Sequence, residues 1–202
     1  MVVARPERAR RMPRAERRQQ ILDAATRAFA RAGFADTGLD VVAAEAGVTP
    51  VILYRHFASK ADLYRAVLES ADTRLSEAVG ADDFDEASIP ALLRAAAANP
   101  DAFRLLFRYA AREPEFRDTI DTLHSSSTEI TRRQLATQTT DDRWRNWAAE
   151  LLPTLTTDAV IAWLDAGQPD PDQAAANIRR VVDAVIEAAH PRTDPTTHRP
   201  GS

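Results

Sequence analysis

Residues 39–57 constrain the fold more than any other stretch, because they combine two helical patterns with the signals that end one helix and begin another. Val42 and Ala46 have the spacing of residues on one helix face. Gly47 follows at the position where a helix usually ends in a left-handed residue, a conformation that glycine adopts without steric cost. The stretch therefore predicts a short helix over about residues 40–46 that stops at Gly47.

A second short helix is predicted directly after this turn. Thr49 is a good N-cap, and Pro50 suits the first helical position, where its missing N–H costs nothing. Leu53 and Phe57 lie four residues apart and are expected to face inward. A helix, a glycine turn and a second helix form a helix-turn-helix, whose second helix lies in the DNA major groove. An ordinary helical hairpin has the same pattern, so this pattern alone leaves both interpretations open.

The distribution of charge favours DNA binding. Residues 1–60 hold 11 basic and 6 acidic side chains, a net charge of +5. Residues 61–202 hold 15 basic and 24 acidic side chains, a net charge of −9. This asymmetry is typical of a phosphate-binding head on a body that DNA repels.

Residues 14 to about 75 resemble the DNA-binding domain of the tetracycline-repressor (TetR) family. The matching positions share the family's residue types at fixed spacing, and they are Ile21, Leu22, Asp23, Ala24, Ala25, Phe29, Gly33, Phe34, Thr37, Ala43, Ala46, Gly47, Val48, Leu53, Tyr54, His56, Phe57, Ser59, Lys60 and Leu63. The resemblance implies an all-α fold of about nine helices. It would consist of an N-terminal three-helix helix-turn-helix domain and a C-terminal helical domain for ligand binding and dimerisation. Residues 163–167 are also similar to a segment of some members.

We expect the chain to be organised in four segments. The first and last are rich in proline and poor in apolar residues, which is typical of disorder. The segments are an Arg-rich disordered arm (1–13), the helix-turn-helix DNA-binding domain (14–60), a helical ligand-binding and dimerisation domain (61–190) and a disordered tail (191–202).

Most candidate DNA contacts lie on or next to the second helix of the helix-turn-helix. The others are a threonine before its first helix and two arginines near the N-terminus. They are Thr37, Thr49, Pro50, Val51, Ile52, Tyr54, Arg55, His56, Lys60, Arg14 and Arg18. Val51 and Ile52 offer methyl groups, which in the major groove contact mainly the methyl group of thymine. Arg55 is expected to contact a guanine or a phosphate. Alternatively, Val51 or Ile52 packs into the core.

A second group of candidates is expected to bind phosphates, which position a protein on DNA and carry little sequence information. Tyr54, His56 and Lys60 have side chains of suitable chemistry at the end of the second helix. The family resemblance implies the same role for the hydroxyl of Thr37.

Two apolar helices near the C-terminus exceed what one small domain needs to cover itself. The first is expected to break at Pro153 and then resume. Pairing both helices with their copies in a second chain would form a four-helix bundle and a two-fold dimer. The candidate dimerisation residues are Val160, Trp163, Leu164, Ile178, Val181, Val182 and Val185. Such a dimer would place two recognition helices ~34 Å apart, or a multiple of that, on a pseudo-palindromic operator. A monomer that buries both helices internally is the alternative.

The middle helices of the chain, between the helix-turn-helix domain and the C-terminal helices, carry the candidate ligand contacts. One of these middle helices is predicted over about residues 100–112. These are Phe103, Arg104, Phe107, Arg108, Phe116, His124, Trp144 and Trp147. Arg104, Arg108 and His124 are polar handles that favour an apolar, acidic small molecule. Aromatic residues at helical spacing are also common in plain cores, so this set is the weaker one.

The sequence therefore predicts a transcriptional regulator that binds double-stranded DNA as a homodimer, most simply a repressor released by a small-molecule effector. The alternative is a dimeric helical interaction module, or a small-molecule-binding protein, without operator specificity. We expect no enzyme, because the chain has no Cys, its four His residues are isolated and it has no Gly-rich phosphate loop. No cofactor or metal is expected. No apolar run reaches the ~18 residues that a membrane helix needs, and a cytoplasmic location follows.

Overall fold

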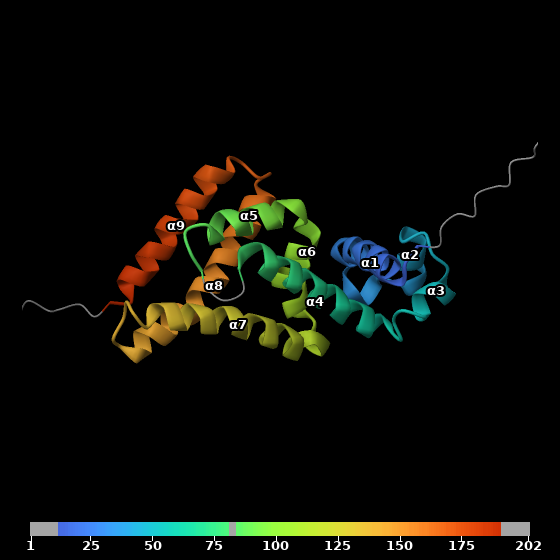
Figure 1. Ribbon diagram of the computed structural model, residues 1–202, viewed down its shortest axis with the longest axis horizontal. Coiled ribbons are helices and arrows are strands. Elements are labelled where there is room, and N and C mark those ends of the chain that lie inside the picture. Colours follow the sequence, from blue (N-terminus) through green and yellow to red (C-terminus); the bar gives the residue numbers. More distant parts are fainter. Residues whose placement is uncertain (1–11, 81–83, 191–202) are drawn as a thin grey trace, which may run out of the picture. The chain divides into compact units, whose positions relative to one another are not determined.

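The computed structural model describes residues 12–80 and 84–190, and all regular elements within these ranges are helical (Figure 1). The predicted all-α fold is thus confirmed. Most of the predicted arm (residues 1–11) and the whole predicted tail (191–202) lie outside the described residues. In the described ranges, none of the helices has the length and apolarity needed to cross a membrane.

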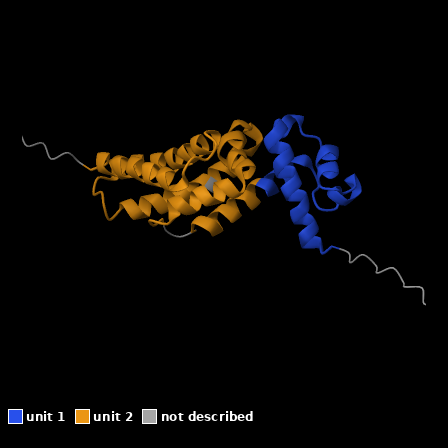
Figure 2. Ribbon diagram, turned by 90° about the horizontal axis from the view of Figure 1, so that it is seen from above, with its two compact units in different colours: residues 1–67 blue, residues 68–202 orange. Residues whose placement is uncertain are grey.

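The chain divides into two compact units, residues 1–67 and 68–202 (Figure 2). Unit 1 holds α1 (Arg14–Asp36), α2 (Leu39–Glu45), α3 (Pro50–Tyr54) and the first part of α4 (Lys60–Val79). Unit 2 holds the rest of α4 together with α5 (Ser88–Ala98), α6 (Pro100–Arg104), α7 (Arg117–Leu135), α8 (Asp142–Asp165) and α9 (Pro171–Ala188). The boundary expected from the sequence, after residue 60, lies at the start of α4, whereas this division falls inside it.

Phe29 is at the centre of the core of unit 1. Its side chain is fully buried, and its ring meets that of Tyr64 edge-on with 4.9 Å between centroids. Gly33, with a φ of 80°, interrupts the helical backbone of α1. Phe34 then packs back on Phe29, with 6.2 Å between the ring centroids. Aromatic pairs of this kind add about 0.5–1.5 kcal/mol to what burial alone contributes.

The turn between α2 and α3 has the geometry that Gly47 predicts. Its φ of 62° is in the left-handed region. The N–H of Val48 donates to the carbonyl of Ala43 at 2.9 Å, and the N–H of Gly47 donates to that of Ala44 at 3.1 Å. These two bonds form a Schellman motif, which satisfies carbonyls that the end of α2 would otherwise leave unpaired. The predicted helix-turn-helix is therefore confirmed in its backbone.

The helix predicted over about residues 100–112 changes its hydrogen-bonding pattern twice. After α6 the chain forms a π-helical turn, then a 3₁₀ turn, and a further 3₁₀ turn leads into α7. These turns are Leu105–Tyr109, Ala110–Arg112 and Pro114–Phe116. The predicted helical segment over residues 100–112 is thus confirmed in extent. Its changes of helix type were not predicted, because residue periodicity does not distinguish helix types of similar pitch.

The predicted break at Pro153 was also wrong, because α8 runs through this residue without interruption. A proline inside a helix costs about 3 kcal/mol, since it lacks an N–H and its ring crowds the preceding turn. Leu152 and Val160 are buried on either side of it. Both halves of α8 pack against the rest of unit 2, and this packing offsets the cost of the proline.

The core of unit 2 contains four of the residues assigned to the dimer interface. Val160, Trp163, Leu164 and Ile178 are 0–8% exposed and pack with residues of α5 and α6 in the same chain. Val182 and Val185 are partly buried against the cores of this unit. Val181 is 44% exposed and is the residue of this set most accessible to a second chain. The set is therefore corrected: a periodic apolar stripe does not reveal which chain will cover it.

Candidate functional site

α3 is anchored on one side and open on the other. Leu53 is fully buried, whereas Val51 is 61% and Tyr54 56% exposed. The hydroxyl oxygen of Thr49 accepts a hydrogen bond from the N–H of Ile52 at 3.4 Å and so caps the helix as predicted. Ile52 is half-buried, so the alternative of core packing holds in part for Ile52 and is wrong for Val51.

A basic cluster lies beside the end of α3. Burial lowers the pKa of His56, and the guanidinium groups of Arg14, Arg18 and Arg17 lower it further, because they stand close enough to repel a proton on the ring. The guanidinium of Arg18 lies 5.1 Å from the centroid of the Phe57 ring. The start of α1 and the end of α3 thus form one positive surface within unit 1. The sequence prediction missed Arg17, although its spacing from Arg14 was a usable signal.

Polar contacts fix α2 on α1 and so set the direction of the turn. The side-chain amide of Gln20 donates to the carbonyl of Ala46 at 2.8 Å. Glu45 forms ion pairs with Arg31 at 2.7 Å and Arg27 at 2.9 Å. The hydrogen bond from Arg31 lowers the pKa of Glu45, an effect that burial partly opposes. Both arginines are largely exposed, so these pairs contribute orientation more than stability.

Two of the predicted phosphate contacts have structural roles instead. Thr37 is 2% exposed, and its hydroxyl donates to the carbonyls of Gly33 at 2.6 Å and Ala28 at 3.3 Å. The ammonium of Lys60 donates to the carbonyls of Phe34 at 2.8 Å and Ala35 at 3.0 Å. Both side chains therefore satisfy carbonyls of α1. The phosphate role is corrected for the buried Thr37, and for Lys60 these two bonds compete with it.

Replacing Lys60 with methionine separates the two roles. The variant keeps a chain of similar length and loses both hydrogen bonds, so we expect the free energy of unfolding of unit 1 to fall by about 1–2 kcal/mol. The slope of the logarithm of DNA affinity against the logarithm of salt concentration should stay unchanged. A phosphate contact would instead reduce that slope by about 0.9 and leave stability intact. Thermal unfolding and a salt titration of DNA binding together decide between them.

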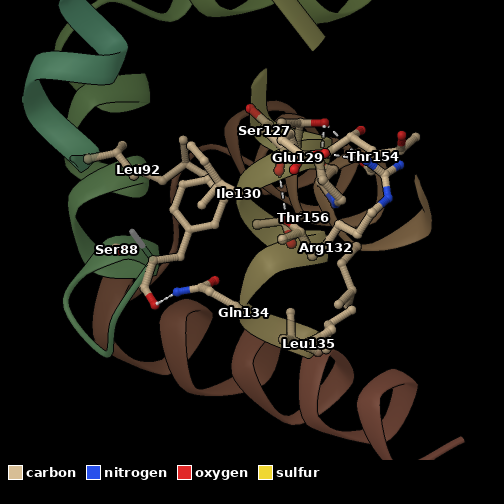
Figure 3. A pocket seen from close by; sticks show the side chains of 18 of the residues that line it. Ser88, Leu92, Ser127, Glu129, Ile130, Arg132, Gln134, Leu135, Thr154 and Thr156 are labelled. Carbon is tan, nitrogen blue, oxygen red and sulfur yellow. Dashed lines mark hydrogen bonds and ion pairs between the residues drawn. The ribbon is translucent and has the colours of Figure 1, made fainter. Parts of the chain in front are cut away.

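Unit 2 contains a cavity of about 1770 Å³ among α4, α5, α7, α8 and α9. Figure 3 shows part of its wall, with Leu92 and Ile130 on one side and the hydroxyl-bearing Ser127, Thr154 and Thr156 on the other. The side-chain amide of Gln134 donates to the carbonyl of Phe84 across one end. The volume is larger than the ~300–1,000 Å³ of most small-molecule sites.

The predicted ligand contacts fall into three groups. Phe107 and His124 line the cavity, with their rings stacked at 5.8 Å. Phe103 and Phe116 are buried and take no part in the lining. The remaining four lie elsewhere on unit 2, and their surroundings differ from those expected.

Arg104 and Arg108 are bound to one carboxylate instead of facing the cavity. Asp165 accepts from Arg104 at 2.9 Å and from Arg108 at 2.6 Å. Trp144 and Trp147 are 46% and 41% exposed and meet edge-on at 5.7 Å. The two arginines are therefore not available as handles for an acidic ligand.

Comparison with known proteins decides the family. Residues 21–67 match the profile of the bacterial regulatory proteins of the tetR family. This part of the chain belongs to the TetR family. The matched residues include most of α1, all of α2 and α3 and the start of α4. Unit 1 is therefore a TetR-type DNA-binding domain.

Curated TetR-family relatives match mainly this N-terminal part. The transcriptional activator FasR of Mycolicibacterium smegmatis is 48% identical over 62 residues, which are 31% of this chain and 28% of FasR. A transcriptional repressor of Streptomyces coelicolor is 39% identical over 90 residues, 44% of this chain and 46% of the repressor. The chain thus matches less than half the length of either protein.

Solved structures of TetR-like proteins share the fold over most of the chain. A TetR-like regulator from a Rhodococcus species has a TM-score of 0.75 at 23% identity, covering 88% of this chain and 99% of its own. NalD of Pseudomonas aeruginosa, the secondary repressor of a multidrug efflux pump, has a TM-score of 0.66 at 20% identity, covering 85% and 96%. At these identities the likeness establishes the fold and no function.

Proposed function

We propose that this TetR-family chain is a transcriptional repressor that binds a pseudo-palindromic operator as a homodimer and is released by a small molecule. The observation that carries the proposal is the open face of α3 beside the arginine cluster of α1. Val51 is exposed at the centre of that face, where major-groove base edges would lie, and the exposed Tyr54 offers its hydroxyl to a phosphate. Arg14, Arg17 and Arg18 offer charges for the flanking phosphates.

Selection from random duplex DNA on the purified chain, with affinity followed against salt, tests this function. We expect an inverted repeat and an affinity that falls steeply with salt, with a slope of about −0.9 for each phosphate contact. If nothing is enriched and binding is weak on all sequences, the chain is a helical interaction module or a small-molecule-binding protein without an operator.

Substituting Val51 by alanine tests how bases are read. We expect the wild type to lose about fivefold in affinity when one thymine of each half-site is replaced by uracil, which lacks the methyl group. The alanine variant should lose most of this difference between the duplexes, because the two γ-methyl groups of valine are gone and only the shorter β-methyl remains. Tyr54→Phe is the matched control, since loss of a phosphate-binding hydroxyl should weaken both duplexes alike. A uracil effect that persists in the alanine variant would contradict the contact.

The second copy is proposed to cover the outer faces of α8 and α9. A groove of about 410 Å³ between these helices is lined by apolar side chains that include Leu155, Ala162 and Val181. Trp144 and Trp147 extend the same face of α8 by helical spacing. Among the described residues of unit 2, the exposed large hydrophobic side chains are these two tryptophans and Val181. Exposed apolar residues gathered on two adjacent helices are typical of a subunit interface.

The cavity of unit 2 is the proposed effector site. It shares α8 and α9 with the proposed interface, so an occupant would act on helices that also set the geometry of the dimer. A ligand that binds one geometry better than the other shifts the equilibrium by its differential affinity, typically 1–3 kcal/mol.

A further inference from the structure

The wall of the cavity in unit 2 is apolar over one part and acidic over another. Leu75, Leu92, Leu106, Phe107 and Ile130 supply the apolar part. Nine carboxylate side chains line the cavity, against three arginines. The arrangement suits a ligand with an apolar body and a positive charge better than one with a negative charge.

Arginines that line the cavity are engaged with other groups of the chain. Arg132 forms ion pairs with Glu129 and Glu150, which also line the cavity. Arg179 donates to the backbone carbonyl of Glu86 at 2.6 Å. These bonds neutralise part of the acidic wall and leave little positive charge to attract an acid.

Asp72 is the carboxylate in the most suitable position. It lies on α4, one helical turn before Leu75, and is half-buried. None of the ion pairs found among the described residues involves Asp72, and His124 is the titratable group whose charge acts on its carboxyl. Burial lowers the pKa of His124, and the carboxylates of Asp121 and Asp72 oppose this effect only in part. Burial thus disfavours a positive charge on the ring beside Asp72.

The solvation of Asp72 also favours a cation. Burial raises the pKa of its carboxyl, because the ionised form has lost part of its contact with water. A cationic group in the cavity would restore the favourable interactions that this carboxylate lacks.

We propose that the cavity binds an amphipathic organic cation, whose ammonium group contacts Asp72 and whose apolar body lies against Leu75, Leu92 and Ile130. That this cation is the effector rests on the proposed function, whereas its binding to unit 2 does not. The acidic effector suggested by the sequence is replaced, because Arg104 and Arg108 are bound to Asp165 and lie outside the cavity lining.

Three probes that each contain a ten-carbon chain test the charge. Decyltrimethylammonium, decanoate and decyl maltoside are titrated into the full chain by calorimetry, each below its critical micelle concentration. We expect the cation to bind at least tenfold more tightly than the anion, with the neutral probe between them. Equal or tighter binding of decanoate, or no binding of any of the three, overturns the proposal.

Asp72→Asn tests the position. The amide keeps the shape and removes the charge, so we expect decyltrimethylammonium to bind about tenfold more weakly and decyl maltoside to be unaffected. Glu77→Gln is the matched control, since Glu77 is exposed on the same helix and is not part of the cavity lining. It should bind all probes as the wild type does. If Asp72→Asn bound the cation with unchanged affinity, a different carboxylate would be responsible for the charge preference. That result would overturn the proposed contact with Asp72.

Operator DNA separates this proposal from the proposed function. If the cation binds and releases the selected operator, both hold. If it binds and no operator exists, the cavity assignment stands and the repressor function fails. If an operator is found and the cation does not bind, the function stands and the ligand class is wrong.

Discussion

Replacing Phe29 with alanine is expected to unfold unit 1 and abolish binding to the operator. The side chain is fully buried among helices α1 and α4, with Tyr64 at 4.9 Å and Phe34 at 6.2 Å between ring centroids. Removing a buried phenylalanine side chain costs about 3–5 kcal/mol, because burial is lost and a cavity remains. A unit of this size has a total free energy of unfolding of about 3–10 kcal/mol. The substitution therefore removes much or all of its stability.

Circular dichroism during heating, together with operator binding at 37 °C, measures the effect. Phe29→Leu is the control, because it keeps most of the volume and should cost less than about 1.5 kcal/mol. Binding of a cavity probe reports separately on unit 2, which has its own core. If Phe29→Ala bound the operator with wild-type affinity, the aromatic cluster would not be what holds the helix-turn-helix in place.

Val181→Asp is expected to convert the proposed dimer to a monomer and to weaken operator binding by a factor of about 10²–10⁴. Val181 is 44% exposed beside the groove between α8 and α9. A carboxylate there would be buried by the second chain, and in a two-fold interface the substitution occurs twice. A single recognition helix would then bind without the effective concentration that a linked partner gives.

Sedimentation and operator titration of the same samples test this expectation. Ala176→Asp is the matched control, because it adds the same charge to an exposed position on a different face of α9. It should remain dimeric and bind the operator normally. A dimeric Val181→Asp with full affinity would place the interface on other helices.

The helix-turn-helix could be predicted because its signals are local. Gly47, Thr49 and Pro50 each act on the backbone of their own turn, and the structure has the expected left-handed residue and cap. Leu53 faces inward as the four-residue spacing required. Such features depend on neighbours in sequence, which are known before the fold is.

The roles of individual side chains away from this turn depended on tertiary partners. Lys60 has the right chemistry for a phosphate, yet two carbonyls at the end of α1 lie within its reach. Arg108 was a plausible ligand contact until α8 brought Asp165 to it from 57 residues away. No spacing rule in the sequence encodes distances between segments so far apart.

The apolar stripes of α8 and α9 show the same limit for assembly. Trp163 and Ile178 have the periodicity of an interface and are buried inside one chain. Val181 shares that periodicity and is exposed. Which residues of α8 and α9 are buried depends on where α5 and α6 lie. The amphipathic pattern of α9 does not predict the position of those helices.

The π-helical turn at Leu105–Tyr109 bears on how this chain diverged from its relatives. Because its hydrogen bonds span five residues instead of four, a π turn holds one residue more than an α turn does, and a helix that gains a single codon can absorb it in this form. Leu105 and Leu106 stay buried at 0% and 1% exposure, so the core tolerates the extra residue. We expect alignments of close homologues to open a one-residue gap at these five positions, dividing the lineage into branches that carry the insertion and branches that preserve the ancestral α-helix.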